Sequence, residues 1–176
     1  MDKKWYLVCT KPQREKKLAA TLTKKKIENF CPLNRIEKIE RSKIRISFEP
    51  LFSSYVFVFI TEAEMNTIRN IDSVINFVYW LGNPVMFKED EIETMRSFTT
   101  QFSNISLIKT RVEVTGRIEA VREYHRNNSV QTDTITLIKD SYKLLLPSMG
   151  YTLVAEKERS TNDVFNYGFE GIKMGS

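Results

Sequence analysis

The aromatic run at residues 48–60, FEPLFSSYVFVFI, has residue types and spacing that suit a binding strand. Tyr55, Phe57 and Phe59 alternate along it, so their side chains share one face of an extended strand. The run is apolar and β-prone, and it is too short to cross a membrane. Such a strand either fills a core or supports an aromatic docking surface, and the residues alone leave both interpretations open.

A basic stripe is the second candidate for binding, on a helix that we expect over residues 12–27. At 100° per residue, Glu15, Leu18 and Leu22 gather on one face of this helix. The opposite face carries cations that could neutralise several phosphates of a nucleic acid. A solvated face of an amphipathic helix would show the same pattern. The cations are Lys11, just before the helix, and Arg14, Lys17, Lys24 and Lys25.

The residue types that enzymes use are sparse in this sequence. The one histidine, His125, lies in a polar segment at 124–128, where a surface loop is the simple interpretation. The chain has no P-loop, Gly-rich dinucleotide turn, nucleophile elbow or zinc-ligand spacing. We therefore expect no catalytic residue, no metal and no cofactor, and a small enzyme is the least supported class.

Charge and cysteine content narrow the class of protein further. Residues 1–48 hold 14 Lys/Arg against 5 Asp/Glu, within a net charge of +5 for the whole chain. A basic first quarter favours contact with a polyanion. There is no apolar stretch of 18 residues and no apolar leader, so we expect neither a membrane span nor a secretory signal. Cys9 and Cys31 suggest no disulfide framework, which favours the cytoplasm.

Hydrophobic periodicity predicts an α+β fold for the first hundred residues. The expected strands are 4–10, 27–33, the aromatic run and 74–80, with a charged hairpin at 35–48. The expected helices are 12–27, 61–70 and 89–102. Thr61 and Glu64 fit a capping box at the start of the second helix. This order of elements predicts an α/β sandwich.

The pattern of polar and apolar residues changes after residue 102. A polar stretch at 103–110 is a candidate linker, and short alternating segments with turn residues between them follow at 111–157. We expect these segments to form a small all-β, barrel-like domain, which is marginal by itself at this size. The predicted division is a first domain at 1–102, the linker, the β domain and a polar tail at 158–176.

An ordered series of motifs resembles one known family. The series is WYLV at 5–8, TKP at 10–12, Glu15, CPL at 31–33, PLFSSYVFV at 50–58, FV at 77–78 and GNP at 82–84. Over about residues 4–100 it resembles the N-terminal domain of NusG-type transcription elongation factors. The segment at 36–58 is more similar to the specialised RfaH-like antiterminators than to general NusG.

The resemblance implies a function in transcription. Domains of this type bind the clamp helices of bacterial RNA polymerase in a hydrophobic depression and touch the non-template single-stranded DNA, which suppresses pausing or termination. By this resemblance Phe52, Tyr55 and Phe57 match the pocket strand, with Cys9 on the strand beside it. We expect Phe52 and Tyr55 to line a partly exposed depression that receives the polymerase helices.

The resemblance also assigns polar and basic residues. Asn66 and Thr67 match the polar motif that faces the opposite side of the DNA channel. Lys11, Arg14 and Lys17 match the region that contacts the DNA strand, although more loosely.

Two departures separate this chain from the family pattern. Ser53 and Ser54 stand where the pocket strand usually has a proline and then a small or polar residue. The C-terminal KOW motif is not legible after residue 107. The ribosome or a termination factor, which that domain contacts in the family, are therefore only candidate partners of this chain.

A rival interpretation is a stand-alone RNA-binding module linked to translation. Its barrel and its basic helix would form one RNA face, and its sheet would expose aromatic side chains for base stacking. A pull-down with the isolated clamp-helix fragment, set against filter binding with RNA, separates the two interpretations.

Overall fold

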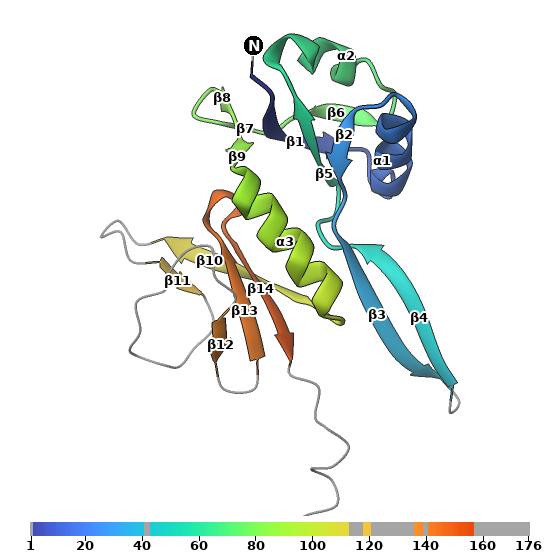
Figure 1. The fold of residues 1–176 in the computed structure, drawn as a ribbon, viewed down its shortest axis with the longest axis vertical. Helices are drawn as coiled ribbons and strands as arrows, with labels where there is room; N and C mark the ends of the chain where they lie inside the picture. The colour runs from blue at the N-terminus through green and yellow to red at the C-terminus, as the bar shows by residue number, and fades with distance from the viewer. Residues whose placement is uncertain (1, 41–42, 113–117, 121–135, 139–140, 157–176) are drawn as a thin grey trace, which may run out of the picture.

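A computed structural model of the 176-residue chain describes residues 2–40, 43–112, 118–120, 136–138 and 141–156 (Figure 1). It has an antiparallel sheet with helices in its first half and a second antiparallel sheet in its last third. The expected loop histidine, His125, and the expected polar tail lie outside the described residues. Within the described part, no helix has the length and apolar character needed to cross a membrane.

The first sheet has the order β2-β5-β1-β6, and β9 also pairs with β1. Strands β1 and β5 are apolar at almost every position because both faces of the sheet are covered, so their buried residues do not alternate with exposed ones. All pairings in this sheet are antiparallel. Its strands are β1 (Lys4–Thr10), β2 (Glu28–Phe30), β5 (Tyr55–Ile60), β6 (Val74–Phe77) and β9 (Met86–Phe87).

Two helices cover one face of this sheet. Helix α1 (Glu15–Lys24) and helix α2 (Met65–Arg69) bury apolar side chains in a core that the sheet shares with them. A short 3-10 turn, η1 (Glu62–Glu64), precedes α2. The predicted capping box is confirmed, because the Thr61 amide donates to the Glu64 carboxylate at 2.8 Å.

A two-stranded arm leaves the sheet, formed by β3 (Leu33–Glu40) and β4 (Lys43–Pro50). It extends away from the first sheet and its helices (Figure 1). This confirms the predicted charged hairpin, although its strands are longer than expected. A smaller hairpin consists of β7 (Tyr79–Trp80) and β8 (Asn83–Pro84).

The second sheet has the order β11-β10-β14-β13-β12. Helix α3 (Glu89–Gln101) runs between the first sheet and these strands (Figure 1). The elements are β10 (Ser106–Val112), β11 (Ile118–Ala120), β12 (Thr136–Ile138), β13 (Ser141–Leu146), the 3-10 turn η2 (Pro147–Met149) and β14 (Tyr151–Glu156). The α+β class is thus confirmed, and a β-rich C-terminal region is present; its closure into a barrel stays a prediction.

One apolar core joins the two sheets. Its members come from the second face of the first sheet, from α3 and from β13 and β14. The fully or almost fully buried members include Trp5, Phe57, Ile92, Met95, Phe98, Leu144, Leu146 and Leu153. Helix α3 therefore packs its apolar stripe against both halves of the chain, as its spacing of Ile92, Met95 and Phe98 allows.

Several predicted boundaries differ from the structure, and three of these differences have an identifiable cause. The first helix starts at Glu15 rather than residue 12, because Gln13 has a φ of 61°, which a helix cannot contain. The predicted strand 74–80 is interrupted at Val78, whose amide donates to the Leu7 carbonyl at 2.8 Å.

The third difference is the candidate linker at 103–110. Most of it belongs to strand β10, which pairs with β14. The polar composition of this segment predicts a linker, and the strand forms because β14 pairs with it. Its entry is fastened to the arm: the buried Asn34 amide donates to the Ile105 carbonyl at 2.8 Å and accepts from the Ile105 amide at 2.9 Å. The division of the chain into two domains near this point stays a prediction.

Candidate functional site

The candidate pocket strand brings Cys9 and Tyr55 side by side. They are direct partners in the antiparallel register of β1 and β5. Both side chains are half-buried, so this pair reaches the surface where the two strands end. Two residues further along the paired strands, Leu7 is the partner of Phe57, and both side chains are buried.

Phe57 is part of the core and supports the site from below. Its side chain is completely buried. Its ring lies 5.9 Å from the ring of Phe30, 6.1 Å from that of Phe52 and 5.0 Å from that of Phe87, measured between centroids. Edge-to-face and tilted aromatic contacts at such distances are favourable. The role of Phe57 that the geometry allows is therefore to fix the rings around it.

Phe52 lies in a less exposed position than we expected. Only 3% of its surface is exposed, so the expectation that it lines an open depression is wrong for this structure. The ring of Tyr151, from β14, covers it with a centroid distance of 6.4 Å. Tyr55 is half-buried and keeps part of its surface open. The difference arises because the C-terminal sheet docks here, which no local pattern in the sequence indicates.

The turn between β4 and β5 sets the positions of Phe52 and Tyr55. Ser54 in this turn has a φ of 69°. The Glu15 carboxylate, at the first position of α1, accepts a hydrogen bond from the Ser54 amide at 2.6 Å. In the sequence, Glu15 belongs to an apolar helix face and to the series of family-like motifs, and neither observation predicts this hydrogen bond. A carboxylate on an apolar helix face indicates a buried and paired group, because glutamate is rarely buried without a partner.

The polar pair Asn66 and Thr67 is exposed on α2. The neighbouring Arg69 organises this surface: its guanidinium donates to Asn66 Oδ1 at 2.8 Å and to the Tyr79 hydroxyl. It also lies over the ring of Phe77, 5.5 Å from its centroid. The role of Arg69 could not be predicted from the sequence, because its contacts with Phe77 on β6 and Tyr79 on β7 form only in the fold.

The basic stripe lies on the exposed side of α1, and all five of its cations are exposed. Lys11 is paired with Asp72, with 3.0 Å between Nζ and Oδ1. The hydrogen bond and charge of Lys11 lower the pKa of Asp72, and Lys17 and Arg14 add to this effect. The pKa of Asp72 therefore responds to the positive charge of all three cations near the start of α1.

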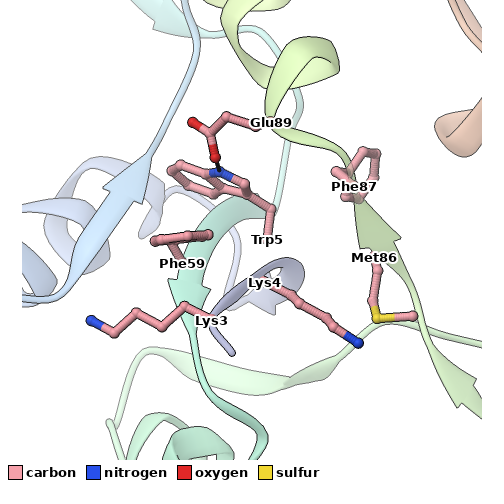
Figure 2. Close-up of a pocket in the computed structure, with 7 residues that line it drawn as sticks. All are labelled: Lys3, Lys4, Trp5, Phe59, Met86, Phe87 and Glu89. Carbon is pink, nitrogen blue, oxygen red and sulfur yellow. Dashed lines mark hydrogen bonds between the residues drawn. The ribbon is translucent and has the colours of Figure 1, made fainter. Parts of the chain in front are cut away.

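A small hollow lies at the other end of β1, with a volume of about 300 Å³ (Figure 2). Trp5 and Phe59 form an aromatic wall, with ring centroids 5.2 Å apart. The Trp5 indole Nε1 donates to Glu89 at 2.6 Å, which joins β1 to the start of α3. Lys3 and Lys4 border the hollow. None of the predicted site residues lines it.

These features describe a small α+β protein with an aromatic strand and a basic helix. Its candidate site is an aromatic strand end beside a basic helix, and within the described residues no cluster of His, Cys, Asp and Glu could hold a metal ion. Residues 3–96 match the NusG family, described as "Transcription termination factor nusG". This match spans more than half of the chain, and the chain belongs to the NusG family.

Membership of this family makes the chain a transcription factor of the elongation and termination machinery and implies binding to RNA polymerase; it is not an enzyme. No curated protein matches the chain. A solved structure titled "Domain interaction in Thermotoga maritima NusG" is similar at 17% identity, over 89% of this chain and 94% of that chain, with a TM-score of 0.46.

Proposed function

We propose that this NusG-family protein is a specialised, RfaH-like antiterminator. It works in the cytoplasm, binds the clamp helices of bacterial RNA polymerase and contacts the non-template DNA strand. Binding to the processive arrangement of the clamp lowers the population of paused states. The sequence of residues 36–58, which resembles the specialised members of the family, supports the narrower assignment.

The observation that carries the proposal is the pairing of Cys9 with Tyr55. Both are half-exposed, and they stand at the end of two strands whose remaining aromatic residues are mostly buried. A rigid aromatic anchor on a firm base is typical of residues that dominate binding energy. Phe57 supplies that base, since three aromatic rings surround it.

The basic stripe fits the second part of the proposal. Arg14 at the N-cap of α1 and Lys17 in its first turn are exposed to solvent, and Lys24 and Lys25 continue the stripe at the far end of the helix. Contacts of this kind hold the phosphates of a DNA strand without reading its sequence. Asn66 and Thr67, exposed on α2, are proposed to face the opposite wall of the DNA channel.

The C-terminal sheet competes with polymerase in this scheme. The ring of Tyr151 lies 6.4 Å from that of Phe52, and we propose that it occupies the face of Phe52 that a clamp helix would contact. Polymerase binding at Phe52 therefore requires Tyr151 to leave. Once displaced, the C-terminal sheet is the part proposed to meet the ribosome or a termination factor.

The rival RNA-binding module is less consistent with the packing. Base stacking on a sheet needs exposed aromatic rings. Trp5 and Phe57 are 1% and 0% exposed, and Phe52 is covered by the protein itself. The aromatic residues of β1 and β5 thus belong mostly to the core, and the exposed aromatic rings of the described residues, Phe48, Tyr79 and Trp80, lie on the two hairpins instead.

A pull-down with the isolated clamp-helix fragment of RNA polymerase tests the proposal. The whole chain should retain the fragment, and a filter-binding assay with single-stranded RNA of matched concentration should show weaker retention. Binding to RNA without binding to the clamp-helix fragment would transfer support to the rival.

A further inference from the structure

The two serines between β4 and β5 form a turn that needs external support. Ser54 has a φ of 69°, in the left-handed region that residues other than glycine rarely occupy. Strained backbone of this kind persists where the surrounding structure holds it, and it is concentrated at functional sites. The turn separates Phe52 from Tyr55 by two residues, so its conformation decides how these two rings lie.

Both backbone polar groups of Ser54 are fastened by other elements. Its amide donates to Glu15 Oε1 at 2.6 Å, and its carbonyl accepts from the Thr10 amide at 2.8 Å. Thr10 ends β1, and Glu15 begins α1. The same short segment, residues 10–15, therefore holds the turn from both sides.

Glu15 is buried in a way that its helix does not require. Only 4% of its surface is exposed, although an acidic residue in a first helical turn favours the helix dipole equally well from solvent. Burial of a carboxylate is costly unless charged hydrogen bonds compensate it. The hydrogen bond from the Ser54 amide supplies this compensation. The inward orientation of the Glu15 side chain is therefore explained by its contact with the turn.

The pKa of a neighbouring thiol agrees with this orientation. Burial raises the pKa of Cys31 to about 11, and the charge of Glu15 adds to the effect. Cys31 precedes Pro32, whose carbonyl accepts from the Leu51 amide at 2.8 Å, next to Phe52. The carboxylate thus lies among the segments that enclose the proposed polymerase site.

We propose that Glu15 is a positioning residue for polymerase binding: its carboxylate holds the left-handed turn at Ser54 and thereby fixes Phe52 and Tyr55. The inference rests on the proposed function, because it concerns the same site. It also explains how the basic helix is held in a fixed position relative to the apolar site. Arg14 and Lys17 lie close in sequence to Glu15, whose hydrogen bond connects α1 to the turn.

The test measures the dissociation constant of the clamp-helix fragment for full-length variants. Glu15→Ala should weaken binding about tenfold or more, the factor that corresponds to the loss of one hydrogen bond to a charged group. Glu15→Gln retains the acceptor and should bind within a few-fold of wild type. Glu15→Asp retains the charge but withdraws the acceptor, so it should also bind weakly; this milder variant serves if Glu15→Ala does not fold.

Rescue distinguishes positioning from a general loss of stability. Glycine adopts the left-handed conformation without strain, so adding Ser54→Gly to Glu15→Ala or to Glu15→Asp should restore most of the affinity. Ile68→Val, in the core on the other face of the sheet, is the control for reduced stability and should bind like wild type. A rescue failure, or equal binding by Glu15→Asp and wild type, overturns the inference. If wild type itself does not bind, the proposed function fails instead.

Discussion

Tyr151 covers Phe52, with 6.4 Å between their ring centroids and an angle of 57° between the rings. The two residues are 99 positions apart in the sequence, and Tyr151 belongs to the C-terminal sheet. This contact joins the proposed polymerase site to that sheet. The exposure of Phe52 therefore depends on where the C-terminal sheet lies.

Removing the covering ring should expose the site. We expect Tyr151→Ala to bind the clamp-helix fragment about 2- to 10-fold more tightly than wild type, because an aromatic pair contributes about 0.5–1.5 kcal/mol to the closed arrangement. Isothermal titration of the full chain measures this. Tyr151→Phe keeps the ring and should match wild type. Equal or weaker binding by Tyr151→Ala would show that the contact does not compete with polymerase.

Tyr55 and Phe57 should separate binding from stability. Tyr55→Ala removes a half-buried anchor, and we expect the dissociation constant for polymerase to rise about 30-fold, equivalent to about 2 kcal/mol, with a cooperative thermal transition retained. Phe57→Leu alters the core that supports this anchor, so it should lower the free energy of unfolding by about 1 kcal/mol and weaken binding less than Tyr55→Ala does. Surface plasmon resonance and urea unfolding check the pair. The opposite assignment of effects would contradict this division of roles.

Local signals in the sequence are sufficient to predict much of the structure of residues 2–102. The limits of β1 were predicted to the residue, because an apolar run ends where Lys11 and Pro12 interrupt it. The capping box at Thr61 was predicted because all of its atoms lie within four residues. Helix α3 was predicted from its apolar spacing and acidic start.

Features that depend on distant segments were not predicted. Strand β10 has too little apolar alternation to be distinguished from a linker, and its pairing with β14 decides its structure. The burial of Phe52 depends on Tyr151, and the role of Glu15 depends on a turn 39 residues away. Residue types identified the candidate site, but the contacts that govern its exposure and rigidity are tertiary.

The basic stripe should control affinity for DNA through charge. Reversing Arg14 and Lys17 to glutamate should weaken crosslinking to the non-template strand in an elongation complex. The slope of log affinity against log salt should become shallower by roughly 0.7 for each phosphate that the variant no longer neutralises. Unchanged crosslinking by this variant would indicate that the stripe is only a solvated face.

Asp72→Asn provides the complementary change. It removes the carboxylate that pairs with Lys11 at 3.0 Å, so Lys11 becomes available to a phosphate. We expect tighter DNA binding and a steeper salt dependence, measured in the same assay. Weaker binding by Asp72→Asn would show that the ion pair orients Lys11 for its contact rather than competing with it.

The Cys31 thiol should be alkylated slowly, and the free energy of unfolding should depend on pH in the alkaline range. Burial, with the charge of Glu15, raises its pKa from 9.0 to about 11. The thiolate is the reactive form, so alkylation by iodoacetamide at pH 8 should be much slower than for a free cysteine. Because the folded pKa exceeds the unfolded value, this contribution to stability is complete below about pH 9 and is lost as pH approaches about 11.

Unfolding measurements across pH test this sign directly. The free energy of unfolding should decline between about pH 9 and about pH 11, and Cys31→Ala should remove part of that decline. The rate of alkylation should rise over the same interval. A thiol that alkylates at pH 8 as fast as free cysteine would contradict the raised pKa.

The last prediction concerns the domain boundary. We expect a fragment of residues 1–102 to fold and to reduce pausing in a purified transcription assay, because the first sheet with α1, α2 and α3 encloses apolar residues of its own. It should be less stable than the whole chain, since α3 loses its packing against Leu144, Leu146 and Leu153. The Tyr55→Ala fragment should fold equally well but should not reduce pausing.

A fragment of residues 1–106 sharpens this test. It retains Asn104 and Ile105, whose backbone groups pair with β3 and with the buried Asn34 amide. Leaving such an amide unpaired costs about 1–3 kcal/mol, so the longer fragment should be more stable than 1–102 by about that amount in urea unfolding. If both fragments unfold, the C-terminal sheet completes a single core and the predicted division is wrong. If they fold but do not affect pausing, the polymerase site proposed around Tyr55 is wrong, and the RNA-binding alternative gains support.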